Sequence, residues 1–99
     1  MSKRSYYLYI TTNPSKTTLY IGVTNNLPRR LQEHLENKNN EDTFSGKYHC
    51  YNLVYCEVYE TMADAIRREK EIKKWRRNKK TELIEQQNPN WEFMNDKML

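Results

Sequence analysis

The sequence is short of the residues that build special small-protein scaffolds. Its only cysteines are Cys50 and Cys56, too few for a disulfide framework or a four-ligand zinc site. We expect two reduced, partly buried thiols, as in a cytoplasmic protein. No run approaches the roughly 20 apolar residues of a membrane span, and the first ten residues lack the apolar stretch of a signal peptide. The expectation is a cytoplasmic chain without a membrane partner.

What is present is a small, polar and basic chain. Ninety-nine residues predict one domain with one modest core, occupying about residues 5–91, and a tail over 92–99 that carries little signal. The chain is 30% charged, but its 12% of aromatic residues favour a folded domain over a disordered one. A net charge of +4 makes a polyanion a reasonable partner.

The pattern of residue types predicts three strands and three helices. Residues 6–11 and 18–23 are rich in aromatic and β-branched types and should form an antiparallel hairpin, because residues 13–16 are a short turn. A helix follows from Pro28, with leucines at 27, 31 and 35. Polar residues 37–47 predict a loop, and residues 52–59 a third strand. Helices are expected over about 62–76, opened by Thr61 and Asp64, and over 81–87, ended by Pro89.

This order, β-β-α-β-α-α, predicts an α/β or α+β fold in which a small three-stranded antiparallel sheet is flanked by helices. Periodicity does not decide which hairpin strand neighbours the third strand.

Three placements are hard to explain by packing alone. Glu69 falls near the centre of an apolar stripe of its helix, where a carboxylate is costly unless it is paired, hydrogen-bonded or bound to a metal. The residues of this stripe are Met62, Ala65, Ile66 and Ile72. A buried salt bridge to an arginine is the structural alternative. Gly22, one of two glycines, lies inside a strand, where it marks a bulge or a close backbone approach. Arg30 and His34 share one helix face, although an arginine at a core edge can also simply snorkel and a histidine can simply pack.

Most of the positive charge lies between residues 67 and 80, where nine Lys or Arg accompany two acids. This run is either a phosphate-binding surface or a solvated helix face. Trp75, within it, either stacks on a base or covers the sheet.

The motifs resemble those of the GIY-YIG nucleases. Tyr7-Leu8-Tyr9, then ten residues, then Tyr20-Ile21-Gly22 is similar to the paired motif that names the family. The run from Asn26 to Leu31 resembles the start of the family's arginine helix, and residues 65–73 resemble its glutamate helix. Tyr7 and Leu8 replace the first glycine and isoleucine. The resemblance covers about residues 5–91 and implies a metal-dependent endonuclease that hydrolyses phosphodiester bonds, with DNA as the expected substrate.

The resemblance also implies roles for individual residues. Tyr9 would be the general base, a role that needs nearby cations or a metal-bound water to lower its pKa. Glu69 would hold one Mg²⁺ or Mn²⁺, Arg30 would grip the scissile phosphate, and Tyr20 would hydrogen-bond a phosphate oxygen or the water. His34 matches a frequent histidine one turn after the arginine. The expected substrate contacts are Gly22, Arg29, Lys73, Lys74, Arg76, Arg77 and Asn88.

Some alternatives stay open. Asn78 rivals Asn88 as the family's late asparagine. A nucleic-acid-binding module without activity, or an interaction subunit of a larger DNA-processing assembly, would need the basic helix but not Glu69.

Overall fold

The computed structural model describes residues 4–36 and 48–98. Its sheet contains β1 (Tyr6–Thr12), β2 (Leu19–Thr24) and β3 (Asn52–Tyr59), in the order β2-β1-β3 with both pairs antiparallel. This confirms the predicted small antiparallel sheet. It also answers what periodicity left open, because β3 lies beside β1 and the two outer strands are β2 and β3.

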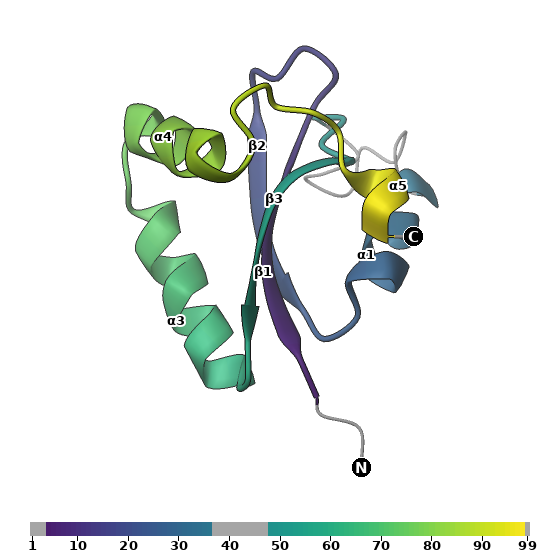
Figure 1. Ribbon diagram of the computed structural model, residues 1–99, viewed down its shortest axis with the longest axis vertical. Helices are drawn as coiled ribbons and strands as arrows, with labels where there is room; N and C mark the ends of the chain where they lie inside the picture. The colour runs from purple at the N-terminus through teal and green to yellow at the C-terminus, as the bar shows by residue number, and fades with distance from the viewer. Residues whose placement is uncertain (1–3, 37–47, 99) are drawn as a thin grey trace.

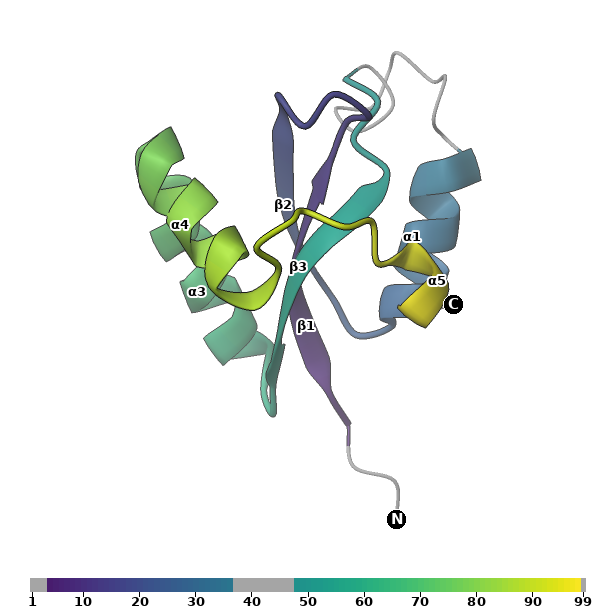
Figure 2. The same ribbon diagram turned by 45° about the horizontal axis from the view of Figure 1, so that its top comes forward.

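Helices cover both faces of the sheet. In Figure 1, α3 (Met62–Lys73) and α4 (Arg77–Gln87) lie on one side, whereas α1 (Leu27–Glu36) and the short α5 (Asn95–Met98) lie on the other. The turned view in Figure 2 shows the same three layers. The loop predicted for residues 37–47 falls outside the described residues.

Alternation along β1 divides the core between the two faces. Leu8 and Ile10 face α3 and α4, where they pack in a cluster with Ile72 and Ile84. Tyr9 points to the opposite face. There it packs with the residues Leu27, Leu31 and Leu53. A large polar side chain is thereby placed in the middle of an apolar layer, and its hydroxyl needs partners there.

The predicted helix boundaries in the basic run are wrong. The α3 helix ends at Lys73, three residues before the expected end, and α4 begins at Arg77, four residues before the expected start. Arg76 is extended, with φ −70° and ψ 159°, although no glycine or proline marks the break. The start of α3 is as expected, because the Thr61 side chain accepts a hydrogen bond from the Asp64 backbone at 3.2 Å.

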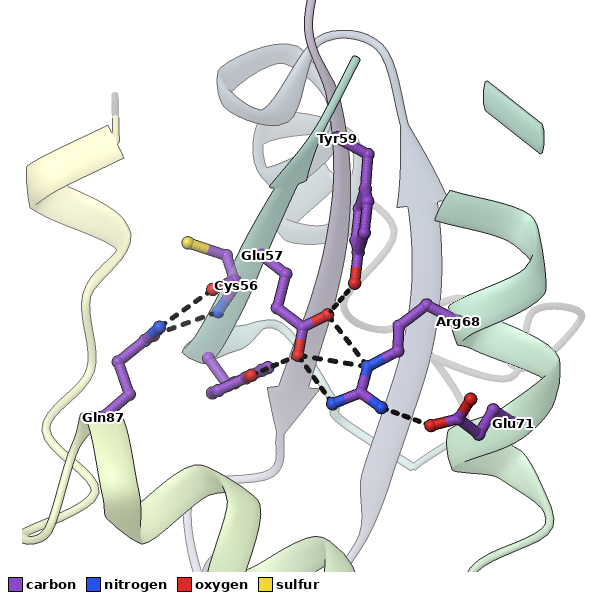
Figure 3. Close-up of polar contacts among 7 residues, drawn as sticks. Cys56, Glu57, Tyr59, Arg68, Glu71 and Gln87 are labelled. Atoms are coloured by element: carbon purple, nitrogen blue, oxygen red, sulfur yellow. Dashed lines mark hydrogen bonds and ion pairs between the residues drawn. The ribbon is translucent and has the colours of Figure 1, made fainter. Parts of the chain in front are cut away.

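Side-chain amides close the outer edge of β3. The β1–β3 register shifts between Ile10 and Thr11, which leaves Val54 as an extra residue in β3. The Nδ2 atom of Asn88 donates to the Val54 carbonyl at 3.0 Å. The Gln87 amide pairs twice with the Cys56 backbone, donating to its carbonyl at 2.9 Å and accepting from its N–H at 3.2 Å (Figure 3). Polar groups of an exposed edge are thus satisfied within the chain.

The segment after Trp91, expected to be a tail of little signal, is bound to the sheet. The Met94 backbone N–H donates to the Leu53 carbonyl at 2.8 Å. The Asn95 side chain accepts from the Leu53 N–H at 2.8 Å and donates to the Tyr51 carbonyl at 2.9 Å. These bonds carry the chain across β3 to the α1 side, as Figure 2 shows.

A charged network that the sequence pattern did not reveal joins β3 to α3. Arg68 donates from Nε to both carboxylate oxygens of Glu57, at 3.0 and 3.3 Å, and the hydroxyls of Tyr55 and Tyr59 also bond this carboxylate (Figure 3). Desolvation works against ionisation of Glu57, but these hydrogen bonds outweigh it and lower its pKa. The network fixes α3 against the sheet.

We expect Asn88→Ala to lower the free energy of unfolding by about 1–3 kcal/mol, because it leaves the buried Val54 carbonyl without its partner. Urea denaturation measures the change. Gln86→Ala, on the exposed side of α4, is the matched control. Equal stability of the two variants would remove the role given to the Asn88 amide.

Candidate functional site

Strand pairing gathers three of the predicted site residues on the face that α1 covers. Tyr9 lies directly opposite Gly22, and Thr11 lies opposite Tyr20. Opposite residues of an antiparallel pair point to the same face. The Tyr9 and Tyr20 side chains and the bare α-carbon of Gly22 therefore meet beneath α1. The Asn26 side chain, which accepts from the Arg29 N–H at 3.2 Å, caps the start of that helix.

Arg30 and His34, on successive turns of α1, bind these tyrosines. Arg30 donates from Nε to the Tyr9 hydroxyl at 3.0 Å and from Nη2 to the Tyr20 hydroxyl at 3.3 Å. His34 Nε2 lies 3.0 Å from the Tyr9 hydroxyl. The Tyr20 and His34 rings meet edge to face, with centroids 5.1 Å apart. We call Tyr9, Tyr20, Arg30 and His34 the tyrosine–arginine cluster.

The proton positions in this cluster follow from its charges. Burial, reinforced by the Arg30 charge, lowers the pKa of His34 to about 4, so this imidazole is neutral at pH 7. Arg30 can only donate, so the Tyr9 oxygen accepts from Arg30. In the His34 tautomer that carries its proton on Nδ1, the Tyr9 hydroxyl donates to His34 Nε2. His34 is only 2% exposed. The leucine pattern of α1 predicts Leu35 as the buried residue of this turn, but Leu35 is only partly buried.

Tyr9 differs from its expected state. Its side chain is 0% exposed. Burial raises the pKa of Tyr9, the neighbouring Tyr20 adds to this, and the attraction of Arg30 offsets only part of the increase. The positive charge of Arg30 therefore does not lower the pKa of Tyr9 enough for Tyr9 to be present as a phenolate, the form in which it could act directly as a base.

The absence of a side chain at Gly22 leaves room for the Tyr9 phenol rather than for an approaching backbone. A Cβ atom at this position would lie 2.5 Å from the Tyr9 hydroxyl oxygen and 3.0 Å from a ring carbon of Tyr20. Real Cβ atoms essentially never approach another atom as closely as 2.5 Å. The strand has a glycine here because the Tyr9 phenol crosses position 22 to reach α1.

Glu69 is at the edge of the α3 interface and not at its centre. Ala65 and Ile72 are buried, but Ile66 is 37% exposed, so the predicted apolar stripe is narrower than expected. The Glu69 side chain is 21% exposed, and its Oε2 atom lies 3.4 Å from Lys73 Nζ. Among the described residues, Glu69 does not form the buried pair with an arginine that was the structural alternative. The carboxylate of Glu57 pairs with Arg68 instead, and both of these side chains are half-buried.

A hollow at the outer edge of β2 connects α3 to the cluster. It has a volume of about 360 Å³ and is lined by Leu19, Tyr20, Ile21, Lys73 and Lys80. We call it the edge hollow. Tyr20 belongs both to it and to the cluster, and Lys73 belongs both to it and to the Glu69 ion pair. Lys80 was not predicted as a substrate contact, because its proximity to Lys73 depends on the break between α3 and α4, which the sequence does not mark.

The other predicted substrate contacts divide into two groups. Arg77 donates to the carbonyls of Thr17 and Lys16, at 2.7 and 3.1 Å, and so holds the hairpin turn. Asn88 is 6% exposed, and its amide is bonded to Val54 and Glu92. Both side chains hold the fold together through these hydrogen bonds, and their substrate roles stay predictions. The exposed group is Arg29, Lys74 and Arg76.

The residues suit a metal site only of a sparse kind. In the described part of the chain, no three His, Cys, Asp or Glu side chains form a cluster that could hold an ion. Glu69 is a single, partly exposed carboxylate, which fits Mg²⁺ because this ion keeps most of its waters and accepts one protein carboxylate plus substrate phosphate.

Comparison with known proteins identifies the family of the chain. The GIY-YIG catalytic domain matches residues 5–82, and the chain belongs to this family. It is similar to a UPF0213 protein from Syntrophus aciditrophicus (strain SB), with 39% identity over 90 residues, 87% of this chain and 94% of that one. A UPF0213 protein from Staphylococcus aureus (strain Mu3 / ATCC 700698) is 34% identical over 82 residues, 83% of this chain and 96% of the relative.

The fold is also found in a solved structure. The solution NMR structure of a UPF0213 protein from Bacillus halodurans superimposes with a TM-score of 0.56 and 25% identity, over 96% of both chains. Membership of the GIY-YIG family indicates a nuclease type of domain, a nucleic acid as its kind of substrate and dependence on a divalent cation as the general rule of such enzymes. Over residues 4–36 and 48–98, no helix has the length and apolar character to cross a membrane.

We expect Gly22→Ala to displace the Tyr9 phenol and to cost about 1–3 kcal/mol of stability, the usual effect of overpacking a filled interior. Thermal or urea unfolding measures this cost, and NMR of the His34 ring reports the lost contact with Tyr9. A Gly22→Ala protein with an unchanged His34 spectrum would show that the phenol does not need this space.

The His34 pKa predicts a pH dependence of stability. The folded pKa of about 4 lies below the ~6.5 of an unfolded histidine, so the unfolded chain binds the proton more tightly. The free energy of unfolding therefore has its full value above pH 6.5. As the pH falls through 6.5 and then 4, protonation of His34 lowers it by up to about 3 kcal/mol. The free energy of unfolding should fall more steeply with decreasing pH for the wild type than for His34→Gln. Parallel curves would contradict the lowered pKa.

Proposed function

We propose that this protein is a metal-dependent endonuclease that hydrolyses phosphodiester bonds in nucleic acid, with DNA as the first substrate to test. One observation carries the proposal: a single arginine is held by two tyrosine hydroxyls beside a hollow whose lining includes Lys73, the ion-pair partner of Glu69. Packing alone does not require this arrangement, since it places polar hydroxyls and a cation in an otherwise apolar layer.

Arg30 is the proposed grip on the scissile phosphate. Its Nε and Nη2 atoms are engaged by the tyrosines, while the side chain remains 35% exposed and its Nη1 atom lies 3.6 Å from the partly exposed Glu33. The phenols hold the guanidinium plane in place before substrate arrives. A prepositioned cation stabilises the charge that builds up on phosphorus without reorganising in the transition state.

The two tyrosines are proposed to have different tasks. Tyr20 is partly exposed and lines the edge hollow, so its hydroxyl is placed to contact the phosphate or the attacking water. Tyr9 is buried with a raised pKa. For Tyr9 to act as the base, it must take a proton from water while it passes its own to His34 Nε2, 3.0 Å away. His34 is then the proton acceptor behind Tyr9.

Glu69 is the proposed ligand for Mg²⁺ or Mn²⁺. A divalent cation bound there would supply charge neutralisation for the phosphate and a bound water of lower pKa. The partial exposure of the carboxylate and its weak, exposed partner Lys73 leave it accessible for this role. A part in DNA repair or recombination is compatible with such an activity.

A binding module without activity is the second candidate. The exposed cations Arg67 and Lys70 of α3 and Lys74 just after it favour it, since they would attract any nucleic acid through phosphate contacts. The same surface would suit an interaction subunit of a larger DNA-processing assembly.

We expect Glu69→Ala to reduce Mg²⁺-dependent or Mn²⁺-dependent cutting by about 100-fold or more, the size of effect seen when one transition-state charge stabiliser is removed. The assay uses a panel of DNA and RNA structures, with gel detection of nicked products. Glu82→Ala, which removes an exposed carboxylate from α4, is the matched control.

Cutting by Glu69→Ala at the wild-type rate would reject Glu69 as the metal ligand. Salt-sensitive binding without metal-dependent cutting in any protein would select the binding module. Absence of nucleic-acid binding would favour the interaction subunit.

A further inference from the structure

Lys73 belongs to two sites at once. Its Nζ atom is 3.4 Å from Glu69 Oε2, and its side chain also lines the edge hollow with Lys80 and Tyr20. The Lys73 side chain is 54% exposed and that of Glu69 is 21% exposed. An ion pair this open to water is weak and exchangeable. Lys73 can therefore leave Glu69 whenever a stronger partner is present on either side.

The edge hollow has the chemistry of a nucleotide site. Leu19 and Ile21 give it an apolar wall, Tyr20 adds an aromatic ring with a hydroxyl, and Lys73 and Lys80 bring two cations. Its volume of about 360 Å³ is within the range of small-molecule pockets. A sugar and base on the wall with one phosphate between the lysines would match these features, because phosphates are bound by lysine charge and bases by aromatic and apolar faces.

We propose that the edge hollow binds one nucleotide of the substrate and that Lys73 couples this binding to the metal. While Lys73 pairs with Glu69, only Lys80 serves the phosphate. When a divalent cation takes the carboxylate, the Lys73 ammonium is released to the hollow and becomes the second phosphate ligand. The inference rests on the proposed role of Glu69 as the metal ligand.

The coupling has a defined sign. Lys73 competes with the cation for Glu69, so removing its charge tightens metal binding. Lys73 adds to nucleotide binding only once the cation has displaced it, so each ligand strengthens the binding of the other through this side chain. By thermodynamic linkage, the factor by which the cation tightens nucleotide binding equals the factor by which the nucleotide tightens cation binding.

Thymidine 5′-monophosphate is a suitable probe, because it has no phosphodiester bond to cut. We expect it to shift the NMR amide signals of Leu19 and Ile21. With Mg²⁺ present, Lys73→Gln should weaken its binding by about three- to tenfold, the value of one typical hydrogen bond in water. Without Mg²⁺ the same substitution should have almost no effect. Lys80→Gln should weaken binding under both conditions.

The metal side is measured by titration with Mn²⁺ and no nucleotide. Lys73→Gln should tighten Mn²⁺ binding about two- to fivefold, as expected for the loss of an exposed ion pair. Lys70→Gln is the matched control, since it removes an equal charge from the outer side of α3. The variant Glu69→Gln should bind the nucleotide without Mg²⁺ as the wild type does with it, and adding Lys73→Gln should cancel this gain.

Three results would overturn the inference: no shifts at Leu19 and Ile21, equal effects of Lys73→Gln with and without Mg²⁺, or equal Mn²⁺ affinities of Lys73→Gln and Lys70→Gln. Failure of the proposed function is separate, because it would appear as unchanged Mn²⁺ binding and unchanged cutting by Glu69→Ala, whatever the nucleotide titration shows.

Discussion

The interaction on which the site depends is the sharing of one guanidinium between two phenols. Arg30 reaches both because Tyr9 and Tyr20 come from neighbouring strands and point to the same face. The contact needs Gly22 for the passage of the Tyr9 ring, and it needs α1 to begin at Leu27 so that its first turn lies above the hairpin. Burial of Arg30 and the two phenols costs desolvation free energy, and the hydrogen bonds among them offset this cost.

Much of this could be predicted from residue patterns. The strands and the start of α3 follow from alternation and capping, and β3 was placed at its observed residues, Asn52–Tyr59. The proximity of Tyr9, Tyr20 and Arg30 was implied by the resemblance to the GIY-YIG family. Local signals were sufficient for the strands and the start of α3, because these elements are bounded by residues with strong turn or cap preferences.

Other features could not be predicted, because they depend on contacts between distant residues. The break before Arg77 has no glycine or proline to mark it, and the Val54 bulge appears only in the register with which β3 pairs with β1. The Glu57–Arg68 pair joins β3 to α3, and it uses an arginine of the run that we interpret from the sequence as either a phosphate-binding surface or a solvated helix face. Burial of Tyr9 likewise follows from tertiary packing, and it reverses the pKa direction that a catalytic base would favour.

The amides of Gln87 and Asn88 make the two borders of the sheet unequal. Along β3, the backbone of Cys56 and the carbonyl of Val54 are already occupied, so an incoming peptide strand finds no ladder to extend there. The opposite border is flanked by lysines, which favour a phosphate chain over another polypeptide. A small sheet can in this way remain open to a polyanion on one side while resisting self-association on the other.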